Sequence, residues 1–162
     1  MYRWLIYLHV LGGLGFMLSH GASALMALQL RREKELPRLR ALLDVSSVSL
    51  AASFASFLLL FLAGIIAGFL GRWWSQGWIW ISLGLLIAIS VIMGSSTRAH
   101  YHELRKVVGL PYMAGNKQMP AQEPGGAQQI QAVLEAHRPV RLTLIGLGGT
   151  GLILWLMMFK PF

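Results

Sequence analysis

The segment that decides the fold is Val45–Leu70, VSSVSLAASFASFLLLFLAGIIAGFL, which contains no Asp, Glu, Lys or Arg. A helix needs about 20 apolar residues to cross a hydrocarbon core of roughly 30 Å. This stretch exceeds that length and therefore predicts a membrane-spanning helix. Strands are not expected, because the segment lacks the alternating pattern of a membrane barrel.

Three further stretches are equally free of charge and lie at Trp4–Leu30, Trp78–Gly94 and Leu142–Phe159. The last two are near the lower length limit, so their helices must stand upright or extend into the interface. The sequence thus predicts an all-α fold, an integral membrane four-helix antiparallel bundle. We expect one transmembrane domain over residues 1–162, with spans at about 4–30, 45–70, 78–94 and 142–159.

The composition agrees with this class. Of the 162 residues, 56% are hydrophobic and 12% are charged, whereas a soluble domain carries roughly 25% charged residues. Such a chain is too hydrophobic to be disordered. The sequence also contains no cysteine, which excludes a disulfide-stapled secreted module.

The cations are unevenly distributed along the chain. Residues 31–44 and 95–141 together hold eleven of the 14 Lys and Arg residues, and all six acidic residues lie there too. Because positive loops stay in the cytoplasm, we expect both termini on the outer side and a cytoplasmic loop at about 95–141. The formal net charge of +8 is then a topology signal. We predict the lipid bilayer as a partner, and no nucleic acid, since no reading module is recognisable.

The connecting segments contain their own signals. In the first link we expect a helix extension, a turn at Pro37 and a return to helix. The third span is expected to continue as a polar helix to Val108, where Gly109-Leu110-Pro111 ends it. A mobile loop is predicted for Ala114–Gln129 and a short amphipathic helix for Ile130–His137. All six Trp residues map near the outer boundary, which predicts an aromatic belt or, alternatively, a docking surface for a partner.

Small residues recur at helical spacing in every span. In lipid, helices associate through close backbone approach rather than water exclusion. Tight packing of a small bundle is one interpretation, and room for a flat cofactor ring is the other. The residues concerned are Gly12, Gly13, Gly15, Ser19, Ser23 and Ala27; Ser46, Ser49, Ser53, Ser56, Ala63, Gly64, Ala67 and Gly68; Gly84, Ala88, Ser90 and Gly94; and Gly146, Gly148, Gly149 and Gly151.

Two histidines, His9 and His20, lie well inside the first span. Intramembrane ionisable residues are functional candidates, and a spacing of 11 residues returns to within about 20° of the same helix face. Imidazole is an iron or copper ligand, and Met93 is predicted at the depth of His20. One hypothesis is therefore a b-type haem held by these three residues. The alternative is that each histidine is bonded to a serine or a backbone carbonyl and is purely structural.

A second group of polar side chains is predicted at the cytoplasmic boundary. His100 and Glu103 are three residues apart and share a helix face, and His137 can approach from the segment before the last span. These residues predict either a metal site or a solvated polar collar. We identify no catalytic residue: the chain lacks a cysteine nucleophile, a phosphate-binding glycine loop and a zinc-binding His-Glu-x-x-His helix.

Three short motifs resemble a known family. They are Leu8-His9-Val10-Leu11-Gly12-Gly13, then His20-Gly21-Ala22-Ser23-Ala24 with Leu30-Arg31-Arg32-Glu33, and Trp155-Leu156-Met157-Met158-Phe159-Lys160-Pro161. Together they resemble an uncharacterised family of predicted four-helix integral membrane proteins, grouped distantly with CopD-type copper-resistance domains. The resemblance implies a multi-pass protein of the bacterial cytoplasmic membrane. Its wider relatives include HemJ-type protoporphyrinogen oxidases, in which a haem-ligating histidine early in the first span matches His9 or His20. Those enzymes also use a lysine in a later span, which has no counterpart here.

From these observations we expect a small non-enzymatic integral membrane protein that serves as an accessory, structural or assembly subunit of a larger membrane complex. Small-residue faces on all four spans exceed what one bundle interior needs and suit packing against other subunits. The alternative is a haem-binding redox protein that uses the intramembrane histidines. A second alternative is a copper-handling protein, for which His9 and Met157 would be ligands.

Overall fold

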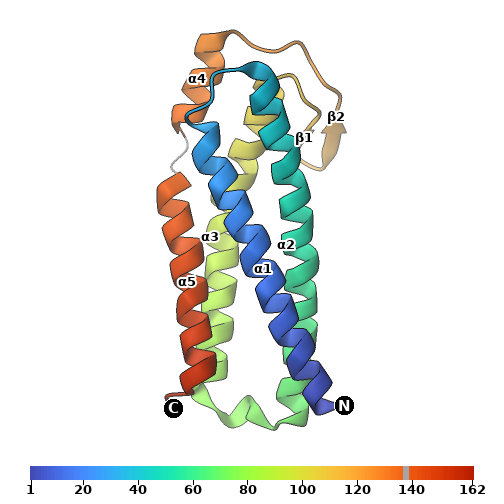
Figure 1. Cartoon of the computed structure of the whole chain (residues 1–162), viewed down its shortest axis with the longest axis vertical. Coiled ribbons are helices and arrows are strands. Elements are labelled where there is room, and N and C mark those ends of the chain that lie inside the picture. Colours follow the sequence, from blue (N-terminus) through green and yellow to red (C-terminus); the bar gives the residue numbers. More distant parts are fainter. Residues whose placement is uncertain (137–138) are drawn as a thin grey trace.

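The computed structural model describes residues 1–136 and 139–162 of the chain (Figure 1). The elements of this part are α1 (Tyr2–Leu30), α2 (Leu36–Leu70), the short 3-10 helix η1 (Trp73–Ser75), α3 (Gly77–Val107), β1 (Tyr112–Ala114), β2 (Lys117–Met119), α4 (Ala127–Ala136) and α5 (Pro139–Phe159). Within it, four helices are long and apolar enough to cross a membrane. This confirms the predicted helical class with its candidate spans and indicates a multi-pass membrane protein.

Two of the helices are longer than the predicted spans. α2 has 35 residues and α3 has 31, so each is well over 40 Å long at about 1.5 Å per residue. The expected turn at Pro37 is wrong, because α2 already starts at Leu36 and places the proline in its first turn. A missing N–H costs nothing there. The predicted polar continuation of the third span is confirmed, since α3 ends at Val107.

The helices form two pairs. α1 packs along α2, α3 packs along α5, and a smaller contact between α1 and α5 joins the pairs. Both chain termini and η1 lie at one end of the molecule, which we call the terminal end (Figure 1). The α1–α2 link, the two strands and α4 lie at the opposite end, which we call the hairpin end. This arrangement places the mixed-charge segments of the sequence at the hairpin end.

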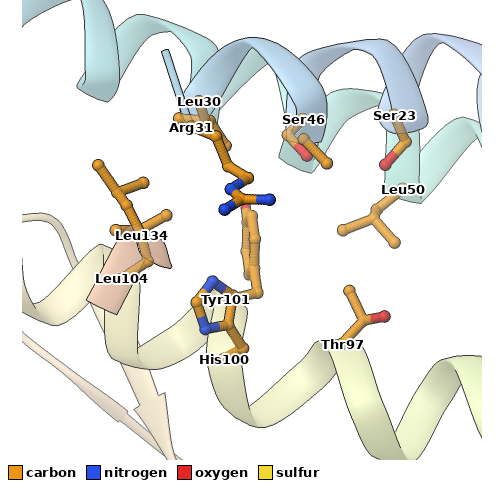
Figure 2. Close-up of a pocket in the computed structure, with 11 residues that line it drawn as sticks. Ser23, Leu30, Arg31, Ser46, Leu50, Thr97, His100, Tyr101, Leu104 and Leu134 are labelled. Atoms are coloured by element: carbon orange, nitrogen blue, oxygen red, sulfur yellow. The ribbon is translucent and has the colours of Figure 1, made fainter. Parts of the chain in front are cut away.

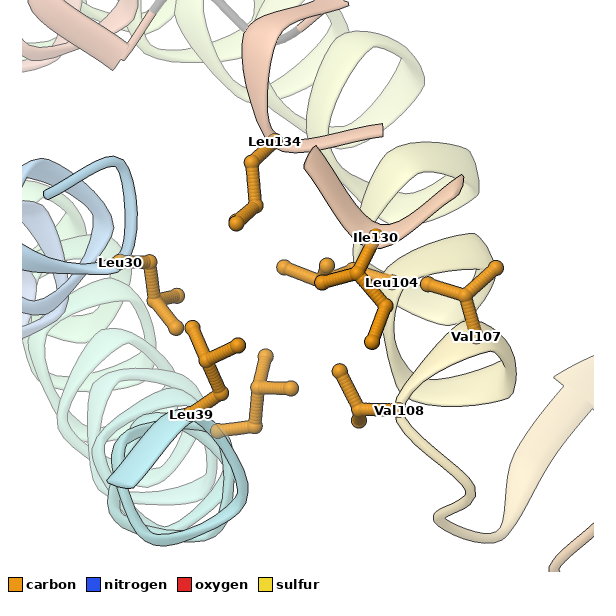
Figure 3. Close-up of a cluster of buried hydrophobic side chains, with 8 residues drawn as sticks. Leu30, Leu39, Leu104, Val107, Val108, Ile130 and Leu134 are labelled. Carbon is orange, nitrogen blue, oxygen red and sulfur yellow. The ribbon is translucent and has the colours of Figure 1, made fainter. Parts of the chain in front are cut away.

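A cluster of buried aliphatic side chains closes the hairpin end (Figure 3). It draws on the end of α1, the start of α2, the end of α3 and one face of α4. Its most deeply buried members, Leu39, Leu43, Leu104 and Val108, are at most 2% exposed. The full cluster comprises Leu30, Leu39, Leu43, Leu104, Val107, Val108, Ile130 and Leu134. The largest fully buried aliphatic side chains therefore lie within the segments that the sequence suggested were connections.

Polar contacts tie α2 to α3 beside this cluster. The Tyr101 hydroxyl donates to the Leu43 carbonyl at 2.8 Å. The Arg105 guanidinium, whose side chain is mostly buried, pairs with the Asp44 carboxylate at 3.2 Å. Each contact satisfies a group at the edge of the apolar cluster, so the two helices are held in register without leaving a buried polar atom unpaired.

The chain leaves α3 through Gly109, which has a φ of +77°. A Cβ at this position would lie 2.8 Å from the guanidinium of Arg40. That guanidinium in turn donates to the Val108 carbonyl at 2.8 Å. The left-handed backbone favours glycine, so this residue allows Arg40 to cap the end of α3.

The predicted mobile loop at Ala114–Gln129 is not what the structure contains. The segment begins inside an antiparallel hairpin that pairs Tyr112 with Met119 and Ala114 with Lys117. Gly115 supplies a φ of +62° in the two-residue turn, as such hairpins require. The Gly115-Asn116 pair was a turn signal that the polar composition obscured. The predicted short helix is present as α4, although His137 lies outside the described residues.

The short link between α1 and α2 is organised by Glu33. Its carboxylate accepts the backbone N–H groups of Lys34 at 2.9 Å and Glu35 at 3.0 Å. These bonds lower the pKa of Glu33. A lowered pKa in the folded state means that the bonds are present above the pKa of an unfolded glutamate. They are lost as the pH falls through the lowered value.

Aromatic rings gather at the terminal end. Tyr2 meets Trp73 edge-on with ring centroids 5.8 Å apart, and the Lys160 ammonium lies 4.8 Å from the Trp73 ring centroid. The Trp78 side chain is buried, and its backbone N–H donates to the Phe162 carbonyl at 3.4 Å. These contacts bring the two chain ends and the α2–α3 connection together. The membrane belt itself remains a prediction.

The buried cluster generates a first test. Leu43→Ala removes a side chain that is fully buried in the cap, so we expect a loss of about 2–5 kcal/mol of unfolding free energy. Leu18→Ala is the matched control, because Leu18 is 76% exposed on α1. The measurement is thermal or denaturant unfolding in detergent. Equal stability of both variants would contradict the assignment of Leu43 to a packed core.

Candidate functional site

The closest approach of two helices occurs between α1 and α2. A Cβ on Gly12 would lie 2.5 Å from the backbone nitrogen of Leu60 and 3.0 Å from the Ser56 carbonyl oxygen. One turn further, a Cβ on Gly15 would lie 2.7 Å from the Ser56 hydroxyl oxygen. Neither glycine can carry a side chain without moving α2. The predicted small-residue packing is therefore realised here as direct backbone contact.

His9 lies at the terminal-end side of this contact and faces α2. Its Nδ1 is 2.8 Å from the Leu60 carbonyl oxygen, and since a carbonyl only accepts, Nδ1 must carry the proton. The imidazole ring fills a notch above Gly64, where a Cβ would lie 2.6 Å from Nδ1. A polar side chain in an apolar zone is thus satisfied by a backbone carbonyl, as the structural interpretation of this histidine requires.

His20 faces a different helix, α5. Its Nε2 lies directly against Gly146, in the space that a Cβ would take, and its ring stacks on Phe16 with centroids 5.6 Å apart and planes 5° apart. The Gly146 carbonyl already accepts a hydrogen bond from the Thr150 hydroxyl at 2.7 Å. Nε2 of His20 is buried and has no hydrogen-bond partner among the described residues. This histidine therefore packs into a second glycine notch.

The three residues of the haem hypothesis are not brought to one point. His9 contacts α2 and His20 contacts α5, although both belong to α1. Met93 is half-buried on α3, and no contact joins it to either ring in the described part of the chain. The notches that could admit a flat cofactor are filled by the imidazoles themselves. The residues present do not fit a haem held between His9, His20 and Met93.

The predicted metal group at the hairpin end is divided by the structure. His100 is half-buried and lines an internal cavity, whereas Glu103 is exposed on the same helix. His137 lies outside the described residues. Within residues 1–136 and 139–162, no group of three His, Cys, Asp or Glu side chains is arranged to hold a metal ion. The neighbouring His102 accepts the backbone N–H of Met113 at 3.4 Å and so anchors the β-hairpin.

The internal cavity was missed by the sequence analysis. It has a volume of about 50 Å³, lies between α1, α2, α3 and α4, and is shown in Figure 2. Its polar lining consists of Ser23, Arg31, Ser46, Thr97, His100 and Tyr101. The Arg31 guanidinium points into it, towards His100 and Tyr101. The Thr97 hydroxyl is buried without a partner among the described residues. A polar space of this size is suited to ordered water.

The signal for this cavity was present but spread over the chain. Ser23, Ser46 and Thr97 are small hydroxyl residues near the same ends of three helices, and Arg31 follows directly after α1. The sequence analysis used Arg31 only as a topology signal and did not use Tyr101. The tertiary contact that fixes Tyr101, its bond to the Leu43 carbonyl, cannot be inferred from spacing within one helix.

The backbone contact at Gly12 generates a matched pair of variants. We expect Gly12→Ala to destabilise the chain by about 1–3 kcal/mol, because the new methyl group would overlap α2. Gly21→Ala should be neutral or slightly stabilising, since a Cβ there meets nothing within 4 Å and alanine is the better helix former. Melting temperatures in one detergent compare the two. A neutral Gly12→Ala would contradict the contact.

Comparison of the chain with protein-family models, with curated proteins and with solved structures finds no match. The resemblance to four-helix membrane proteins therefore rests on the short motifs in the sequence and stays a prediction. The function must be argued from the geometry of the helices and of the two glycine notches.

Proposed function

We propose that this chain is a small non-enzymatic membrane protein that acts as an accessory, structural or assembly subunit of a larger membrane complex. In this proposal its four apolar helices cross a bacterial cytoplasmic membrane as an antiparallel bundle. The hairpin end faces the cytoplasm, and both termini face outward. The concentration of cations in residues 31–44 and 95–141 supports that orientation through the positive-inside rule.

The observation that carries the proposal is a set of glycines that pack against nothing in the chain. Gly84 on α3 and Gly148 and Gly151 on α5 each have open space where a Cβ would lie, whereas Gly12, Gly64 and Gly146 are filled by neighbours. A glycine in a helix costs about 1 kcal/mol relative to alanine. The three open glycines do not recover that cost through packing within the chain.

Small residues on a lipid-facing helix have a direct use. They allow the backbone of another helix to approach closely, which is the main source of attraction between helices in lipid. On α3, Ala88 is exposed one turn after Gly84, which gives the small-xxx-small spacing of such contacts. We therefore propose that the occupant of these faces is a transmembrane helix of a different protein.

A redox role has one observation in its favour, the unpartnered Nε2 of His20. It has less support than a subunit role, because His9 is already bonded to the Leu60 carbonyl and faces another helix. An absorption spectrum of the detergent-purified chain separates the two proposals. A Soret band that disappears in His20→Ala would favour the haem protein.

The chain contains no cysteine, so a single introduced cysteine reports its own surroundings. We expect Gly148→Cys to form a crosslink to a partner protein in native membranes treated with a thiol-reactive bifunctional reagent. The matched control is Leu154→Cys, which is exposed but lies about 120° around α5 from residue 148. The products are identified by gel shift and mass spectrometry.

Three outcomes of this experiment bear on the proposal. A product larger than the chain, formed by Gly148→Cys and not by Leu154→Cys, supports a partner helix at the glycine face. A product of twice the chain mass that contains only this chain would replace the partner by a second copy. An uncrosslinked monomer with both variants would contradict the subunit proposal.

A further inference from the structure

A lateral groove lies between the last turns of α1 and the first turn of α5. It has a volume of about 520 Å³ and is separate from the internal cavity, although Arg31 lines both. The lining consists of Leu25, Leu28, Gln29, Arg31, Arg32 and Val140. Leu25 is 66% exposed and Val140 is 53% exposed, so apolar side chains are open to whatever surrounds the protein at this point.

The groove changes character along α1. Leu25 and Leu28 lie within the apolar helix, whereas Arg31 and Arg32 follow immediately after its last residue, Leu30. A molecule that fills the groove therefore meets hydrocarbon at one end and two guanidinium groups at the other. This combination suits an amphiphile rather than a small ion or a fully apolar ligand.

The two arginines have no acidic partner in the described part of the chain. The ion pairs there are formed by Arg38 and Arg105. The nearest carboxylate in the sequence, Glu33, accepts the backbone N–H groups of Lys34 and Glu35 instead. Arg31 and Arg32 are both exposed. Their N–H groups are consequently open to an anion from outside the chain.

We propose that this groove binds an anionic phospholipid of the surrounding membrane. Arg31 and Arg32 hold the lipid phosphate, and an acyl chain lies along Leu25 and Leu28. A guanidinium presents paired donors that match phosphate oxygens, and basic pockets beside membrane helices recognise acidic headgroups in this way. Arg31 lines the internal cavity as well, so a bound phosphate and the cavity share one guanidinium. The proposal does not require a partner protein.

The test uses the full chain in nanodiscs of phosphatidylcholine or of phosphatidylglycerol with the same acyl chains. We expect native mass spectrometry to show phosphatidylglycerol retained on the protein in preference to phosphatidylcholine. The Arg31→Gln/Arg32→Gln variant should lower that retention about tenfold. Lys34→Gln/Lys117→Gln is the matched control: it removes the same charge from exposed positions outside the groove, and its retention should stay unchanged.

Two further arms keep the result decisive. Gln29→Trp retains both arginines and narrows the groove, so it should also lower retention even if the double arginine variant fails to fold. Free glycerol phosphate at millimolar concentration should leave the retained lipid in place, because it lacks an acyl chain. Displacement by glycerol phosphate would show a site for a free anion. That result, or equal retention in all variants, would overturn the proposal.

Discussion

The contact between Gly12 of α1 and the backbone of α2 at Leu60 is the constraint on which the rest of the structure depends. In hydrocarbon, burying an apolar side chain against another helix gains little over burying it against lipid. Only close backbone approach and satisfied polar groups distinguish one helix neighbour from another. At Gly12 both are available, because the adjacent His9 donates to the Leu60 carbonyl. The same helix then offers His20 to the Gly146 notch of α5, which joins the two helix pairs.

The hairpin end is stabilised by a different force. There the chain leaves the apolar segments, and Leu39, Leu43, Leu104 and Val108 are removed almost completely from solvent. At this end water exclusion supplies the driving force that is absent inside lipid. A chain closed by this cap and by the glycine contact can leave glycine faces of α3 and α5 open. That division is consistent with a protein whose outer faces serve another helix.

The sequence predicted the helices well because uncharged length is a local property, and it predicted small-residue packing because the spacing is visible within one helix. It could not assign neighbours. His9 and His20 are close to one helical face by spacing, yet the crossing of α1 over its neighbours sends one ring to α2 and the other to α5. The cap was missed for a similar reason: Leu43, Leu104 and Leu134 lie far apart in the chain and amid charged residues. The hairpin was missed because composition outweighed the Gly115-Asn116 turn signal.

The central claim is that the intramembrane histidines are packing elements seated in glycine notches. It is tested most directly by solid-state NMR of His9 in the full chain, labelled with 15N and 13C and reconstituted in lipid. The account predicts a protonated Nδ1 in close contact with the carbonyl carbon of Leu60. An unprotonated Nδ1 without that contact, or ring nitrogen shifts typical of metal ligation, would contradict it.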